Sequence, residues 1–178
     1  MAAVEKDRAY VEAGIPELGA YLLSDELYWP ITARGYHLPR LTIGGILLAK
    51  TRLEARGERI SSLVAGLEAL RSKWRVAWET KAGREVQARM RLWGEYLSDY
   101  RQDPEGHADA YPHEVRYRVM LHLLLAELPA PPPEREELIH LDSLLHVNLM
   151  PGDFVWETDL ESGFPNEVYW YLYGQLRS

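Results

Sequence analysis

The segment from Pro112 to Leu128 constrains the fold most, because its apolar residues cover two faces of the helix that it predicts. One side carries only leucines and the other carries mostly valines (Leu121, Leu124, Leu125 and Leu128 against Val115, Val119 and Leu123). A helix that is apolar on both sides has to lie between neighbouring elements. We therefore expect this segment at the centre of the fold, with the rest of the chain packed around it.

The remainder of the sequence also favours helices. Glycine and proline recur at intervals that suit helices, and no run alternates apolar with polar residues long enough to indicate a sheet. A chain of 178 residues has the usual size of one domain. The sequence therefore predicts an all-α, single-domain irregular helical bundle over residues 1–178, with about six or seven helices and little or no β-structure.

The positions of glycines, prolines and capping residues predict helices at residues 4–12, 16–24, 43–57, 58–101, 112–128, 134–147 and 165–174. Residues 25–39 contain two prolines and a glycine, so we expect a loop there that packs its aromatic side chains. An unbroken helix over 58–101 would be roughly 65 Å long, which exceeds the diameter of a compact domain of this size. Because the apolar stripe changes phase near Gly83, we expect either a kink there or a straight helix that changes its packing partner midway, and the excess length indicates a break or a protruding end.

Composition excludes several classes of protein. Hydrophobic residues make up 47% of the chain and charged residues 26%, which excludes a largely disordered or a membrane-embedded protein. The N-terminus lacks the apolar core of a secretion signal, so we expect a cytoplasmic protein with no membrane partner. The absence of cysteine excludes thiol catalysis, disulfides, thiolate zinc sites and iron-sulfur clusters.

The aromatic residues suggest a contact surface. The chain has six Trp and 11 Tyr against two Phe, and rings with a polar tip suit interfaces better than deep cores. The pattern Glu-apolar-Tyr-Trp occurs twice, so the two segments can meet in space. The leading hypothesis is a non-catalytic interaction module that binds a protein partner or a second copy of itself through a Tyr- and Trp-rich surface (Tyr28, Trp29, Trp156, Tyr169 and Trp170). The plainer alternative is that these rings close the chain ends over the core.

A second hypothesis places a ligand pocket beside the central helix. Arg116, Arg118 and His122 lie on that helix, where a charged group needs a partner. Together with Trp29, Trp156 and Tyr169 they would form a pocket for a small anionic or aromatic ligand, in a binding protein or an enzyme. The structural alternative is that the arginines bridge to acidic residues on adjacent helices.

A third hypothesis is nucleic-acid binding through a basic helix over residues 71–91. Eleven of the 20 basic residues lie between Lys50 and Arg91, interleaved with Trp74 and Trp78. Both tryptophans lie on the apolar stripe, however, and the rest of the chain carries an acidic excess, so the sequence argues against this reading.

No motif in the sequence predicts a catalytic residue, a metal ligand or a cofactor. Glu137 and His140 form one Glu-x-x-His pair, whereas a carboxylate-bridged metal site needs a second pair and further glutamates. No Ser-His-Asp order occurs, and Gly44-Gly45 is too short to indicate a phosphate-binding loop. Whether the protein is an enzyme therefore stays open at this stage.

Overall fold

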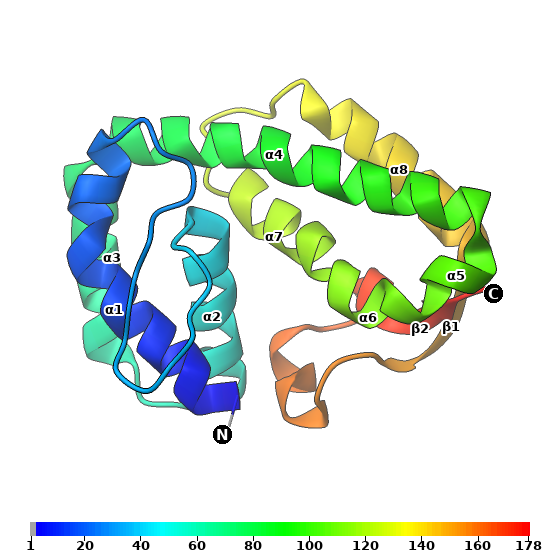
Figure 1. Ribbon diagram of the computed structural model, residues 1–178, viewed down its shortest axis with the longest axis horizontal. Helices are drawn as coiled ribbons and strands as arrows, with labels where there is room; N and C mark the ends of the chain where they lie inside the picture. The colour runs from blue at the N-terminus through cyan, green and yellow to red at the C-terminus, as the bar shows by residue number, and fades with distance from the viewer. Residues whose placement is uncertain (1–2) are drawn as a thin grey trace.

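The computed structural model describes residues 3–178, and the chain is mostly helical with one small sheet (Figure 1). The helices are α1 (Ala3–Leu23), α2 (Ile43–Ala55), α3 (Ser61–Lys73), α4 (Arg75–Gln102), α5 (Pro104–His107), α6 (Tyr111–Glu114), α7 (Arg116–Leu125) and α8 (Glu134–Asn148). Three 3-10 turns follow the same order: η1 (Ala108–Ala110), η2 (Thr158–Gly163) and η3 (Trp170–Leu172). Two antiparallel strands, β1 (Leu149–Phe154) and β2 (Tyr173–Leu176), complete the fold.

Helix α7 lies where the sequence predicts, between other elements. It packs against α2 on one side and α4 on the other, and α8 lies beyond α4 in Figure 1. Val119, Leu121 and Leu124 are inaccessible to solvent. Helices α1 and α2 lie side by side at one end of the molecule, with α3 behind α1 (Figure 1). None of the helices within residues 3–178 is both long and apolar enough to span a lipid bilayer.

The two helices expected on either side of Pro16 are a single helix, α1. A proline inside a helix removes a backbone hydrogen bond and costs roughly 3 kcal/mol. That cost is outweighed because α1 buries side chains both before and after the proline, including Tyr10, Val11, Leu18 and Tyr21. Each such side chain contributes about 2 kcal/mol by leaving water.

The loop between α1 and α2 and the start of α2 agree with the sequence prediction. Residues 24–42 hold no helix, and short bridges such as the one between Trp29 and Leu41 fix their path. The Thr42 hydroxyl accepts a hydrogen bond of 2.9 Å from the amide of Gly45 and thereby caps α2. Gly57, with φ of 70°, ends the segment as expected.

The break in the long helical segment falls at Trp74, not at Gly83. Trp74 has φ of −114° and ψ of 39°, which separates α3 from α4, whereas Gly83 lies inside α4. The helix is therefore continuous at Gly83, in agreement with the second of the two alternatives, and its packing partners change along its length. Trp78 packs in the core near Glu127, and the later part of α4 packs against α7 and α8.

The last helix predicted from the sequence, residues 165–174, is also wrong. The segment forms η3 and then strand β2, which pairs with β1 through Leu149 with Leu176 and Met150 with Gln175. Tyrosine and valine suit strands at least as well as helices, so the nearby partner strand decided the outcome.

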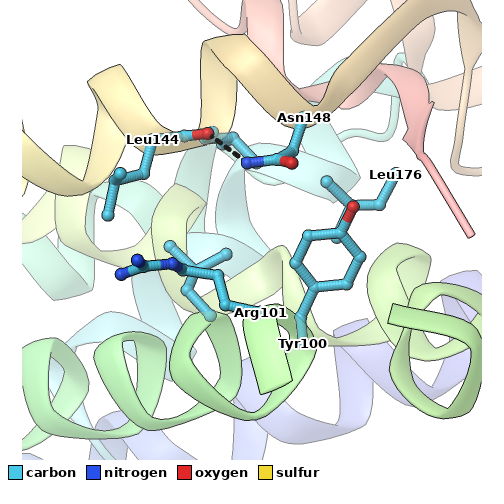
Figure 2. A pocket seen from close by; sticks show the side chains of 7 residues that line it. Tyr100, Arg101, Leu144, Asn148 and Leu176 are labelled. Carbon is cyan, nitrogen blue, oxygen red and sulfur yellow. Dashed lines mark hydrogen bonds between the residues drawn. The ribbon is translucent and has the colours of Figure 1, made fainter. Parts of the chain in front are cut away.

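The gap between the ends of α4 and α8 and strand β2 is small. Figure 2 shows the gap where α4, α8 and β2 meet, with Tyr100 and Arg101 facing Leu144, Asn148 and Leu176. Its volume is about 10 Å³, which is room for one water molecule at most.

Candidate functional site

The candidate site is a cavity of about 570 Å³ between α1, α2 and α7, bounded at one end by α4 and residues 37–40. Six permanently charged cations line it: Lys6, Arg40, Arg52, Arg56, Arg89 and Arg116. Only two carboxylates line it with them, Asp7 and Glu157. We call this cavity the basic pocket. Its positive excess stands out in a chain whose net charge is −7.

The pocket runs along α2, because α1 and α7 both lie antiparallel to that helix. On the α7 side, Leu124 lies against Gly44 near the start of α2, so Arg116, two turns earlier on α7, lies near its end. On the α1 side, the Tyr10 hydroxyl bonds the amide of Thr42. The residues that line the pocket run from Thr42 and Gly45 at the start of α2, which we call its upper end, to Arg52 and Arg56 at the end of α2, its lower end.

A buried polar network forms the floor of the upper end. Glu85 is inaccessible to solvent, and its carboxylate accepts a hydrogen bond of 2.7 Å from the amide of Gly44. Arg89 pairs with the same carboxylate at 3.2 Å and reaches the hydroxyl of Thr42 at 3.3 Å. The buried carboxylate has both a charged partner and a backbone donor, which is what keeps such a group tolerable inside a protein.

This network explains the two consecutive glycines. A Cβ at Gly44 would lie 2.7 Å from Glu85 Oε1, and one at Gly45 would overlap the hydroxyl of Tyr10. The two amides are also occupied, since Glu85 binds one and Thr42 binds the other. The first turn of α2 is therefore not a phosphate-binding loop, and an anion in the pocket has to be held by side chains.

Arg52 dominates the lower end. Its side chain is 28% exposed, and its Nε is buried with no hydrogen-bond partner. Its nearest carboxylate, that of Asp7, lies 3.8 Å away, beyond hydrogen-bond distance, and the ring of Trp156 lies 5.0 Å from its guanidinium carbon. Burial lowers the pKa of Arg52, although the charges of Asp7 and Glu157 act in the opposite direction; Arg56 and Arg116 lower it to a smaller extent.

Two further titratable groups at the lower end have shifted pKa values. Burial raises the pKa of Asp7 above 3.8, although Arg52 and Arg56 both act in the opposite direction. Arg56 itself is well paired, at 3.1 Å with Asp7 and 2.9 Å with Asp159. Burial and the charge of Arg116 lower the pKa of His113 below 6.5, so this imidazole is neutral near pH 7.

The arginines that the sequence singled out point to different sides of α7. Arg116 lines the basic pocket, where its guanidinium lies 4.2 Å from the ring of Tyr117. Arg118 lies outside it and forms a bidentate pair with Asp142 of α8 at 2.8 and 2.9 Å. Residues two apart in a helix lie on nearly opposite faces, so one arginine faces the cavity while the other bridges to an acidic residue.

The aromatic candidates are divided in the same way. Tyr28 lies 5.7 Å from the Arg89 guanidinium and Trp156 lies 5.0 Å from that of Arg52, so both contact arginines of the basic pocket without lining it themselves. His122 and Tyr169 make an edge contact with each other, with 4.9 Å between ring centroids, on a different side of the molecule. The structure therefore brings together only some members of the predicted pocket.

The two Glu-apolar-Tyr-Trp segments do not meet. Trp29 donates a hydrogen bond of 3.0 Å to Glu17 of α1 and makes an edge contact with Tyr21. Trp170 stacks on His146 of α8, with 3.6 Å between ring centroids. Figure 1 places α1 and the end of α8 at opposite ends of the molecule.

Every tryptophan and tyrosine of the chain is buried or half-buried. This includes Trp74 and Trp78, the two rings of the basic segment, of which Trp78 is in the core. The structure therefore offers no row of exposed rings on which nucleobases would stack. Within residues 3–178, no three His, Asp or Glu side chains converge on a point where they would hold a metal ion.

No family model, curated protein or solved structure matches this chain. The site therefore has to be interpreted from its own chemistry. Of the six pocket cations, only Arg116 is identified by the sequence reasoning. A weak indication of the others is present, since Arg52 and Arg56 lie one turn apart on α2, which is otherwise apolar on the face it buries.

Proposed function

We propose that this protein binds a small anionic molecule in the basic pocket. The observation that carries the proposal is Arg52, a mostly buried side chain whose Nε has no hydrogen-bond partner within residues 3–178 and whose guanidinium is paired only loosely, at 3.8 Å, with Asp7. Burying a charged donor without a partner costs free energy, and such a group is retained where a ligand completes it. A carboxylate or phosphate supplies the acceptors that a guanidinium fits.

The size and charge of the cavity support the same conclusion. Small-molecule pockets commonly measure about 300–1,000 Å³, and this one measures about 570 Å³. Its lining has six fixed positive charges against two carboxylates, so an anion neutralises the lining and a cation does not. The polar hydroxyls of Thr42 and Tyr10 are already engaged in the floor network, which favours binding over nucleophilic chemistry.

The hypothesis of an interaction module stays a prediction. It depends on tryptophan and tyrosine side chains that a partner can reach, whereas these side chains are all at least half-covered by the chain itself. The pocket gives the anionic-ligand hypothesis a definite place, with Arg116 as the residue that both arguments share.

Calorimetric titration with sulfate at constant ionic strength tests the proposal. We expect saturable binding to the unmodified protein and a loss of about tenfold or more in affinity for Arg52→Met, since a charged hydrogen bond contributes about 1.5–3 kcal/mol. Arg91→Met is the matched control, because Arg91 is exposed on α4 and does not line the pocket. No binding, or an equal loss in both variants, would contradict the proposal.

A further inference from the structure

We infer that the exposed side of α8 is a docking surface for a second copy of this chain, with the two copies related by a two-fold axis at Ser143. The inference is independent of the basic pocket and of the tryptophan and tyrosine side chains. It follows from apolar side chains that the fold leaves uncovered and from the symmetry of their positions along the helix.

One side of α8 is not covered by the rest of residues 3–178. The helix packs against α4, lies at the edge of the molecule in Figure 1 and buries the leucines of one side (Leu138, Leu141 and Leu145). On the other side, Ile139 is 57% exposed and Val147 is 72% exposed. At 100° per residue, both lie within about 40° of Ser143. We call the exposed residues within about 60° of Ser143 the outer face (Glu136, Ile139, His140, Ser143, His146 and Val147).

The two apolar positions of the outer face complement each other. Ile139 lies four residues before Ser143 and Val147 lies four residues after it, which is about 6 Å along the axis in each direction. When two copies of α8 pack antiparallel about a two-fold axis at Ser143, Ile139 of each copy therefore lies at the height of Val147 of the other. Both exposed apolar side chains of each helix gain an apolar neighbour in this way.

Ser143 suits the point where the helices cross. Its side chain is small, so the two helices can approach closely there. Its hydroxyl already donates a hydrogen bond of 3.1 Å to the carbonyl of Ile139, so burial leaves that donor satisfied. Glu136 and His146 lie near opposite ends of the outer face, and antiparallel packing brings the carboxylate of one copy within about one helical turn of the imidazole of the other. These features favour a second copy over a partner of unrelated sequence.

The interface is small, because each copy contributes one helix face. Interfaces below the standard size are usually weak and reversible, so we expect a dimer with a Kd on the order of 100 µM. Sedimentation equilibrium between about 10 µM and about 1 mM should show the average mass rising from one chain towards two across that range. A mass that stays at one chain up to about 1 mM would overturn the inference.

Two substitutions on the outer face test the antiparallel arrangement. Ile139→Lys and Val147→Glu should each weaken association at least about tenfold, because each places a charge against an apolar side chain. Both positions are exposed, so the folded monomer tolerates the changes. An equimolar mixture of the two variants should dimerise again, since the new lysine of one chain lies at the height of the new glutamate of the other.

Val76→Lys is the matched control, because Val76 is 78% exposed at the start of α4 and lies outside the outer face. This variant should associate as the unmodified protein does. A dimer that survives both outer-face substitutions would show that another surface forms it. Failure of the mixture to recover would exclude the antiparallel register.

Cross-linking at Ser143 gives a second measurement. The chain contains no cysteine, so a disulfide in Ser143→Cys can form only between two copies. Facing Cα atoms of two closely crossing helices are about 5 Å apart, which a disulfide spans. Under mild oxidation we expect a covalent dimer of Ser143→Cys and little of Ser72→Cys, whose position is exposed on α3. Equal cross-linking of the two variants would contradict a two-fold axis at Ser143.

Discussion

Two arginines of this protein should respond in opposite ways to the same substitution. Arg52 and Arg118 are both mostly buried, with side chains 28% and 10% exposed. Arg118 holds Asp142 through two hydrogen bonds, whereas the Nε of Arg52 has no hydrogen-bond partner within residues 3–178. Methionine keeps most of the apolar stem in either case, so the comparison isolates the charged group.

Arg118→Met should destabilise the fold. The substitution leaves the carboxylate of Asp142, only 20% exposed, without its ion-pair partner. Breaking a buried pair by removing one member costs about 3–5 kcal/mol, and the partial exposure of Asp142 puts the expected loss near the lower value. The contact of the guanidinium with the Tyr171 ring, 4.4 Å from its centroid, is lost as well.

Arg52→Met should leave stability almost unchanged. Removing the Nε, which has no hydrogen-bond partner, relieves a penalty of about 1–3 kcal/mol, while the repulsion from Arg56 and Arg116 and the attraction of Glu157 disappear together. Against this, the contact with Trp156 contributes about 1 kcal/mol and the long ion pair with Asp7 at most about 1 kcal/mol. The stabilising and destabilising contributions to the free energy of unfolding of Arg52→Met therefore cancel to within about 1 kcal/mol. The affinity of the same variant for the anion should fall about tenfold or more.

Urea unfolding followed by tryptophan fluorescence gives the free energy of unfolding of each variant, and calorimetry with sulfate gives the affinity. The reasoning predicts that stability and binding separate: Arg118→Met loses stability, and Arg52→Met loses binding. If Arg52→Met unfolds as easily as Arg118→Met, Arg52 is a structural residue, and the argument for a retained ligand-binding cation is refuted.

Three further predictions concern the pocket and the helices around it. Sulfate affinity should rise as the pH falls from 7 towards 4. Burial raises the pKa of Asp7 above 3.8, and protonation of this carboxylate removes a negative charge from the pocket. Protonation of His113, whose pKa lies below 6.5, adds a positive charge and therefore acts in the same direction. Calorimetry should show that Asp7→Asn binds sulfate more tightly at pH 7 and has a flatter pH profile. Gly45→Ala should cost about 1–3 kcal/mol in urea unfolding, because its methyl overlaps the Tyr10 hydroxyl, and an equal cost in the Tyr10→Phe background would count against that cause. Gly83→Ala should raise the free energy of unfolding by about 0.5–1 kcal/mol, since the nearest atom, of Leu128, would be 4.0 Å from the new methyl; a destabilised variant would show that the site does not tolerate it.

The sequence was informative where a local pattern dictates the structure. The burial of α7 follows from leucines and valines on two faces, and the limits of α2 follow from Thr42 and Gly57. Prediction from the sequence failed where two local conformations have similar free energy and tertiary packing decides between them. Pro16 does not end α1 because the buried face continues past it, and residues 173–176 form a strand because β1 is available as a partner.

The candidate site was predicted only in small part, since Arg116 was the one pocket cation that the pattern identified. Helical spacing alone predicts that Arg116 and Arg118 lie on nearly opposite faces, so the sequence was sufficient to show that the two arginines cannot both line one pocket. Nothing in the spacing distinguishes Arg52, whose Nε has no hydrogen-bond partner in the described part of the chain, from Arg56, which pairs with two carboxylates one turn later. Their difference depends on Asp7 and Asp159, which come from remote parts of the chain.

The sequence by itself determined that this protein is helical, which segment lies at its centre and which chemistry a cysteine-free chain lacks, because periodicity and composition act locally. The tertiary structure alone decided that cations from α1, α2, α4, α7 and a loop surround one cavity, and that the buried Nε of Arg52 has no hydrogen-bond partner within residues 3–178. The physical reason is that the state of a buried charge depends on which groups the fold brings within a few ångströms of it, and that distance is set by packing between elements.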